Sequence, residues 1–150
     1  MTYQLIFHDN IKRFENTLLE NAKQEKRTKG RGPWIDLAER YIIQKERIRL
    51  YPLPEDFNDQ TPEEENPPVI KHIERNTELT SLFRWGLPGQ STGNHRLLYV
   101  FHNYYKVILL HHFDKQYNGD IKRQDIQPAE LRYFDYCIDD PSLYPMTKGE

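Results

Sequence analysis

The stretch SLFRWGLPGQSTGNHRLLYVFHNYYKVILLHHFDK, residues 81–115, decides the fold. It contains three apolar runs of strand length, near residues 81–87, 95–102 and 105–113. The last two are apolar almost throughout, as expected of central strands that are covered on both faces. The segment Gly86–Asn94 is predicted to be a loop, and His102–Tyr104 a turn. Three strands with short connections predict an antiparallel meander.

The residues before the meander predict a further strand and a helical hairpin. Residues 2–8 mix β-formers with polar residues, and Asp9 or Asn10 would cap the helix that follows. Apolar residues recur at helical spacing through residues 10–27 and again through 34–49. Two glycines and a proline separate the two runs, which favours an antiparallel pair of helices on one face of the sheet.

Two segments complete the chain. Residues 51–68 contain five prolines and the run Glu63–Glu65, so we expect an exposed loop, mobile at 55–66. Val69–Arg75 is predicted to be a short strand or a turn. A last helix contains Pro128, which requires a start near Pro128 or a kinked helix that starts near Asp120. The fold class expected is therefore α+β: an antiparallel sheet of about four strands, the helical hairpin and a C-terminal helix.

Size and composition limit the class of protein. A chain of 150 residues predicts one domain, and the 13% aromatic content argues against disorder. One cysteine, Cys137, excludes an internal disulfide, and no apolar run is long enough to span a membrane. With no signal peptide pattern, the expected location is the cytoplasm. A net charge of −2 argues against a general nucleic-acid coat protein, although residues 1–50 carry 11 basic and 7 acidic side chains.

Within residues 69–138 the sequence resembles the RelE/ParE superfamily, the toxin components of type II toxin–antitoxin pairs. The residues that carry the resemblance are Ser81–Arg84, His95–Tyr99, Leu109–Lys115, and the spaced Ile126, Ala129 and Arg132 of the last helix. The order of elements along the whole chain is similar as well. The resemblance implies a partner antitoxin and, in the members that act on RNA, cleavage of mRNA on the ribosome by attack of a ribose 2′-hydroxyl.

The resemblance also implies site residues. It places Arg96 where active members hold the phosphate with an arginine, and it gives Arg84 the same role. Lys115 matches the first lysine of a basic pair whose second position is Gln116 in this chain. His112 and Tyr117 are the candidates for proton transfer, and Tyr117 is also a candidate for stacking on a base.

Four histidines, His95, His102, His111 and His112, crowd one hairpin and could suggest a metal. Strand alternation puts His111 and His112 on opposite faces, so we expect no metal site and no cofactor.

Two functions remain open. One is a ribosome-dependent mRNA endoribonuclease with an antitoxin, the ribosome and mRNA as partners and no membrane contact. The other is a non-catalytic binding protein on the same fold, either a toxin directed at DNA gyrase or an inactive relic of a mobile element. A third reading, an unrelated α+β domain of unknown role, also stays open. The missing basic residues at positions 116 and 118 favour the second.

Overall fold

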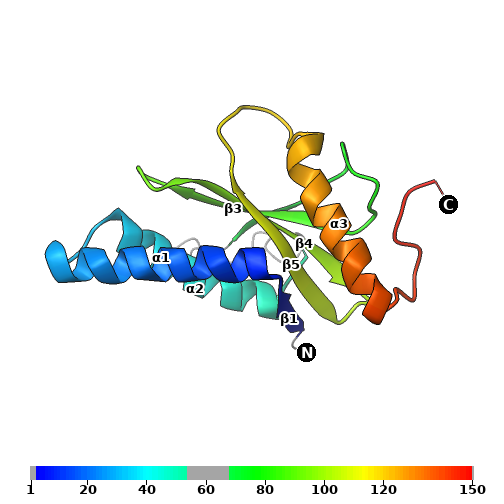
Figure 1. The fold of residues 1–150 in the computed structure, drawn as a ribbon, viewed down its shortest axis with the longest axis horizontal. Helices are drawn as coiled ribbons and strands as arrows, with labels where there is room; N and C mark the ends of the chain where they lie inside the picture. The colour runs from blue at the N-terminus through cyan, green and yellow to red at the C-terminus, as the bar shows by residue number, and fades with distance from the viewer. Residues whose placement is uncertain (1–2, 54–67, 150) are drawn as a thin grey trace.

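The computed structural model describes residues 3–53 and 68–149 of the chain. Its elements in order are β1 (Gln4–Phe7), α1 (Asp9–Thr28), α2 (Pro33–Leu50), β2 (Val69–His72), β3 (Leu82–Gly89), β4 (Gly93–His102), β5 (Lys106–Asp114) and α3 (Arg123–Asp139) (Figure 1). The predicted α+β class, the helical hairpin and the C-terminal helix are confirmed. The prediction that residues 55–66 are exposed and mobile lies outside the described residues.

The sheet differs from the prediction in two ways. It has five strands in the order β1-β5-β4-β3-β2, and not four, because residues 69–72 form a strand on the outer edge of β3. It is mixed, and not antiparallel, because β1 pairs in parallel with β5, Leu5 opposite Val107. The residue types in a strand reflect how it is buried and packed, and carry no information about the direction of its partner.

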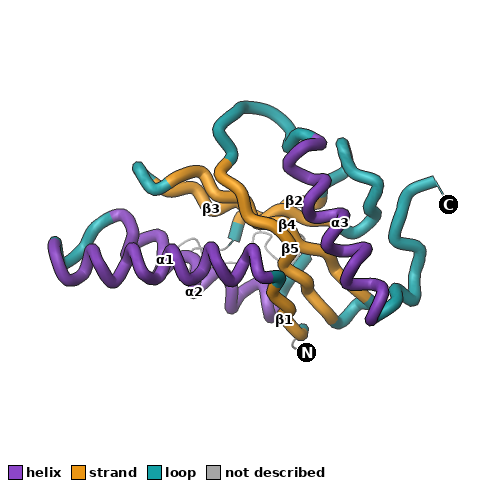
Figure 2. Tube along the Cα trace, viewed as in Figure 1, coloured by secondary structure: helices purple, strands orange, loops and turns teal. Residues whose placement is uncertain are grey.

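Two separate cores hold helices to the two faces of the sheet (Figure 2). On one face the hairpin α1–α2 buries residues such as Ile11, Leu37 and Tyr41 against Trp85 and Leu97. On the other face α3 packs its own apolar residues against Leu98, Val100 and Ile108 from the alternate positions of β4 and β5. The central strands are therefore covered on both sides, as their continuous apolar character predicts.

The start of α1 corrects a detail of the sequence analysis. The N-cap is His8, not Asp9 or Asn10: its ring nitrogen Nδ1 accepts a hydrogen bond from the backbone N–H of Asn10 at 3.1 Å. The next helix, α2, starts with Pro33 in its first turn, where a proline lacks no hydrogen bond that the helix needs.

The predicted loop at 86–94 is mostly strand. β3 continues to Gly89 and β4 begins at Gly93, so only residues 90–92 form the tip of a long hairpin. Within the described residues β2 pairs with β3 only as far as Gly86. Pro88 therefore lies in the two-stranded part of the sheet, where a residue without an N–H is tolerated. Gly86, Pro88 and Gly89, which predicted a loop, are instead paired with β4 as residues of β3.

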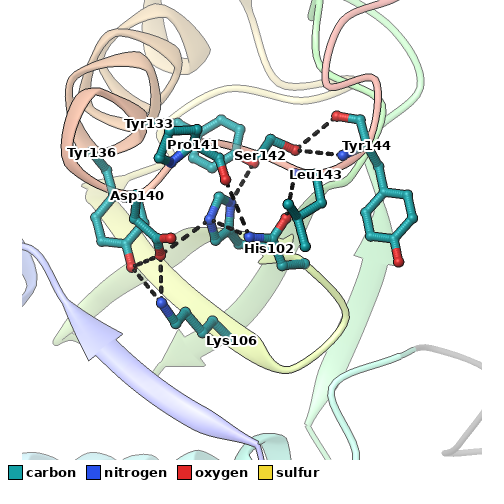
Figure 3. Close-up of polar contacts among 10 residues, drawn as sticks. His102, Lys106, Tyr133, Tyr136, Asp140, Pro141, Ser142, Leu143 and Tyr144 are labelled. Carbon is teal, nitrogen blue, oxygen red and sulfur yellow. Dashed lines mark hydrogen bonds and ion pairs between the residues drawn. The ribbon is translucent and has the colours of Figure 1, made fainter.

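The last helix begins at Arg123, between the two predicted starts, and carries Pro128 in its interior. Its C-terminal end is fastened to the β4–β5 turn by a polar cluster around His102 (Figure 3). His102 is completely buried; its Nδ1 lies 2.8 Å from the Tyr133 hydroxyl and its Nε2 lies 3.3 Å from an oxygen of Asp140. Lys106 also pairs with Asp140. The predicted turn at His102–Tyr104 is confirmed, with positive φ at Asn103 and Tyr104.

Candidate functional site

A recess of about 410 Å³ opens on the α3 face of the sheet, beyond the start of α3. Basic side chains from β2, β3, β4 and the end of β5 line it, together with one from the connection after β2. They are Lys71, Arg75, Arg84, Arg96 and Lys115. Two carboxylates, Glu74 and Asp120, also line the recess, so its formal charge is positive. We call this surface the basic recess.

Arg84 and Arg96 approach each other above Gly86. A side-chain carbon on Gly86 would lie 3.6 Å from the Arg96 guanidinium and 3.7 Å from that of Arg84. Gly86 is directly opposite Arg96 in the β3–β4 register. The two guanidinium groups therefore lie within contact distance of one point above Gly86, on the same face of the sheet.

Arg96 is held in place without a negative partner. Its Nη1 donates to the side-chain oxygen of Asn94 at 2.7 Å and to the carbonyl of His95 at 3.0 Å, while its buried Nε has no hydrogen-bond partner. Burial lowers the pKa of Arg96, and the charge of Arg84 lowers it further. Among the described residues no carboxylate pairs with either arginine. Within residues 3–53 and 68–149, the guanidinium is therefore fixed by neutral oxygens and not by a carboxylate.

Lys115 contributes the third charge. It is 8% exposed, and its ammonium donates to the carbonyl of Tyr117 at 2.9 Å and lies 4.8 Å from the centre of the Tyr117 ring. Burial lowers the pKa of Lys115, with further lowering from Arg96 and then Arg84. A lysine that is desolvated and surrounded by cations loses its proton more readily than a surface lysine.

Tyr117 supports Lys115 and is not among the residues that line the recess. Its hydroxyl donates to a carboxylate oxygen of Asp125 and accepts from the backbone N–H of Lys122 at 3.1 Å. Lys122 lies 4.6 Å from the centre of the ring. Burial raises the pKa of Tyr117, and the bond to Asp125 raises it further. These two hydrogen bonds hold the Tyr117 hydroxyl at the start of α3.

His112 lies on the other face of the sheet. Its ring stacks on Phe14 of α1 with centroids 3.8 Å apart, and its Nε2 lies 2.8 Å from Nδ1 of His95. Burial lowers the pKa of His112 to about 3, and the neighbouring His95 adds to the effect. By contrast, His111 faces α3, 2.6 Å from an Arg132 nitrogen. The predicted opposite orientation of His111 and His112 is confirmed, and the structure does not bring His112 to the basic recess.

Of the five predicted site residues, the structure therefore brings Arg84, Arg96 and Lys115 together, places Tyr117 against Lys115, and separates His112 from them. The sequence analysis missed Lys71 and Arg75, which line the recess, and Gly86 and Asn94, which lie against its arginines. Asn94 holds Arg96 through its oxygen and donates to the backbone carbonyl of Lys115 at 3.0 Å. The strand register places Lys71 opposite Arg84 and Gly86 opposite Arg96, whereas Asn94 is two residues from Arg96 along β4.

A second polar cluster of the described residues is structural. The cluster around His102 is buried and links α3 to the β4–β5 turn, as described above. Within residues 3–53 and 68–149, no three imidazole, thiol or carboxylate groups gather as a metal site requires. None of the helices in this part of the chain is both long and apolar enough to cross a membrane.

The chain matches no protein-family model, no curated protein and no solved structure. The class that the fold itself defines is an α+β protein whose five-stranded mixed sheet is covered by a helical hairpin on one face and a single helix on the other. Its distinguishing feature is a recess that presents two arginines and a buried lysine without carboxylate partners among the described residues.

Proposed function

We propose that the chain is a toxin of the RelE/ParE type that cleaves mRNA on the ribosome. The observation that supports this proposal is the convergence of Arg84, Arg96 and Lys115 in one recess. Three neighbouring cations with no carboxylate partner in the described part of the chain are expected to destabilise the free protein, and a bound phosphate group would relieve that cost. Arginine matches phosphate oxygens with two parallel donors, and RNA supplies phosphates beside the 2′-hydroxyl that this reaction needs.

The geometry suggests a division of roles. Arg84 and Arg96 would hold the non-bridging oxygens of the scissile phosphate and stabilise the charge that gathers there when the 2′-oxygen attacks. Lys115, whose pKa is lowered by burial and by both arginines, would accept the proton of the 2′-hydroxyl as that oxygen bonds to phosphorus. It would return the proton to the 5′-oxygen as the bond between phosphorus and the 5′-oxygen breaks. Asn94 and Tyr117 would position these groups, since each contacts one of them directly.

One observation favours the second function, a toxin directed at DNA gyrase. His112 lies on the far face of the sheet, and the hydroxyl of Tyr117 is bound to Asp125. His72 borders the recess, but its Nε2 lies 2.8 Å from the carbonyl of Thr80 and its ring packs against Phe83. A recess that binds an anion without an imidazole to transfer protons also suits a purely binding role.

In either case the partner would be an antitoxin whose acidic segment covers the recess and neutralises Arg84, Arg96 and Lys115. The expected evidence is a complex when the chain is co-expressed with the product of the neighbouring gene. Failure to form a complex with either neighbour would argue against a toxin–antitoxin pair.

The deciding experiment induces the wild type and Arg96→Ala side by side and maps mRNA 5′ ends. Removing one donor to a developing phosphate charge typically costs about a hundredfold in rate. We therefore expect growth arrest and cleaved mRNA with the wild type, and neither with Arg96→Ala. Arg27→Ala, an exposed arginine near the end of α1, is the matched control and should behave as wild type. Growth arrest with intact mRNA would favour the gyrase-directed toxin, and normal growth with intact mRNA the inactive relic.

A further inference from the structure

The basic recess extends further than the three residues that the proposed cleavage needs. Lys71, on the edge strand β2, is directly opposite Arg84 in the β2–β3 register, and therefore on the same face of the sheet. Lys71 also lines the recess. Like charges directly opposite each other in neighbouring strands destabilise a sheet. Among the described residues no carboxylate pairs with Lys71.

Four cations thus form a row across four strands. Lys71 comes from β2, Arg84 from β3, Arg96 from β4, and Lys115 follows the last residue of β5. Neighbouring strands lie about 4.8 Å apart, so three intervals separate the ends of the row by about 14 Å across the sheet. Arg96 is opposite Gly86, two residues beyond Arg84, and Lys115 lies two residues beyond Phe113, the partner of Arg96. The row is therefore diagonal to the strands and about 20 Å long at the backbone. We call it the cation row.

The cation row is longer than one phosphate group. Arg84 and Arg96, which meet above Gly86, are sufficient to hold one phosphate by two forks of donors. Lys71 lies on one side of this pair and Lys115 on the other, so each end of the row offers an ammonium to a further phosphate. Ammonium groups suit this role because they make point contacts with phosphates of variable orientation.

The shape of the recess favours a single strand of RNA. A volume of about 410 Å³ is within the range of small-molecule sites and is much smaller than the groove needed to hold a duplex. The 117–122 connection forms one wall through Gly119, Asp120 and Ile121. A polymer with regularly spaced phosphates can follow the open ends of such a recess, while a duplex cannot enter it.

We propose that the cation row binds consecutive phosphates of one RNA strand, which crosses β2 to β5 diagonally, with Lys71 as the contact furthest from Lys115. This inference rests on the proposed RNA-binding function and adds to it the path of the RNA and the role of β2. Lys71 is a binding residue in this scheme and takes no part in proton transfer.

The test measures binding and not cleavage. Fluorescently labelled 2′-O-methyl RNA, which lacks the attacking hydroxyl, is titrated with the purified chain at several salt concentrations. For single strands the logarithm of the affinity falls with the logarithm of salt by about 0.7 per phosphate contact. We expect Lys71→Gln to lower this slope by about 0.7 and to weaken binding severalfold at low salt. Lys12→Gln, an exposed lysine on α1 across the sheet, should change neither.

The length of the RNA gives a second measurement. Affinity should rise as the oligonucleotide grows from two to four residues in the wild type, and the rise should end one residue earlier in Lys71→Gln. Equal slopes and equal length dependence in wild type and Lys71→Gln would overturn the proposal. Equal affinity for a duplex of the same sequence, or binding of a polyglutamate peptide in preference to RNA, would overturn it too.

The outcomes separate this inference from the proposed function. If Lys71→Gln binds as the wild type does while Arg96→Ala abolishes mRNA cleavage, the cation row is wrong and the toxin proposal stands. If the wild type binds no RNA at any length, on or off the ribosome, both proposals fail. If the slope changes as expected while induced wild type leaves mRNA intact, the cation row stands without the endoribonuclease.

Discussion

The substitution Arg96→Met should stabilise the free protein, although it removes a site residue. Arg96 is partly buried, has no carboxylate partner among the described residues and lies beside Arg84 and Lys115. Methionine keeps the length and the apolar stem of the side chain and removes the charge. A side chain that is selected for ligand binding often lowers the stability of the free protein.

The size of the effect follows from three contributions. Because both guanidiniums lie close to one point above Gly86, two charges about 7 Å apart at an effective dielectric constant of about 20 repel by about 2 kcal/mol. The buried Nε of Arg96 without a partner adds about 1 kcal/mol or more. Against this, the variant loses two hydrogen bonds, to Asn94 and to the His95 carbonyl, of about 1 kcal/mol each. The net gain in unfolding free energy is about 1 kcal/mol, which corresponds to about 3 °C in Tm.

The assay is thermal unfolding followed by circular dichroism at low and high salt. Salt screens repulsion between the three cations, so added sodium chloride should raise the Tm of the wild type more than that of Arg96→Met. Pyrophosphate, which binds only the folded state, should raise the Tm of the wild type and have little effect on the variant. The matched control is Arg27→Met, whose Tm should stay close to that of the wild type.

A clear decrease in the Tm of Arg96→Met, together with a salt dependence equal to that of the wild type, would refute this reasoning. Arg96 would then be a structural arginine whose stem covers the sheet and whose charge is already satisfied. The proposal of an anion site would lose its main support.

Three further predictions concern single residues. The pKa of Lys115 is lowered in the folded state, so between that value and 10.5 the unfolded chain binds more protons than the folded protein. The free energy of unfolding should therefore rise with pH in this window, and Lys115→Met should remove that part of the rise. Urea titrations of both proteins at pH 8 and pH 10 measure the difference. The pKa of His112 is about 3 in the folded state, below that of an ordinary histidine. As the pH drops below 6.5, the free energy of unfolding should therefore fall by up to about 1.4 kcal/mol per pH unit. Urea titrations of His112→Phe should show a smaller fall than those of the wild type. Gly86→Val should leave Tm nearly unchanged while weakening pyrophosphate binding at least tenfold in calorimetry, because its branches would separate Arg84 from Arg96; unchanged affinity would contradict the role given to Gly86.

Local patterns in the sequence determined the elements and their burial. The two helices of the hairpin, the three strands of the meander and the turn at 102–104 follow from spacing, because the period of apolar residues differs between helices and strands. The same alternation placed His111 and His112 on opposite faces, since it depends on neighbours along the chain. Arg84, Arg96 and Lys115 were identified from the resemblance to the RelE/ParE superfamily.

Only the tertiary structure decided which residues meet across the sheet. The parallel pairing of β1 with β5 and the pairing of β2 with β3 depend on contacts between segments far apart in the chain, which no local pattern encodes. That register put Lys71 opposite Arg84 and put Gly86 beneath two guanidiniums, and it left His112 on the wrong face for catalysis at the recess. A charged side chain looks the same in the sequence whether a carboxylate faces it or not. Among the described residues, the lack of a carboxylate beside Arg84 and Arg96 is visible only once the strands are aligned.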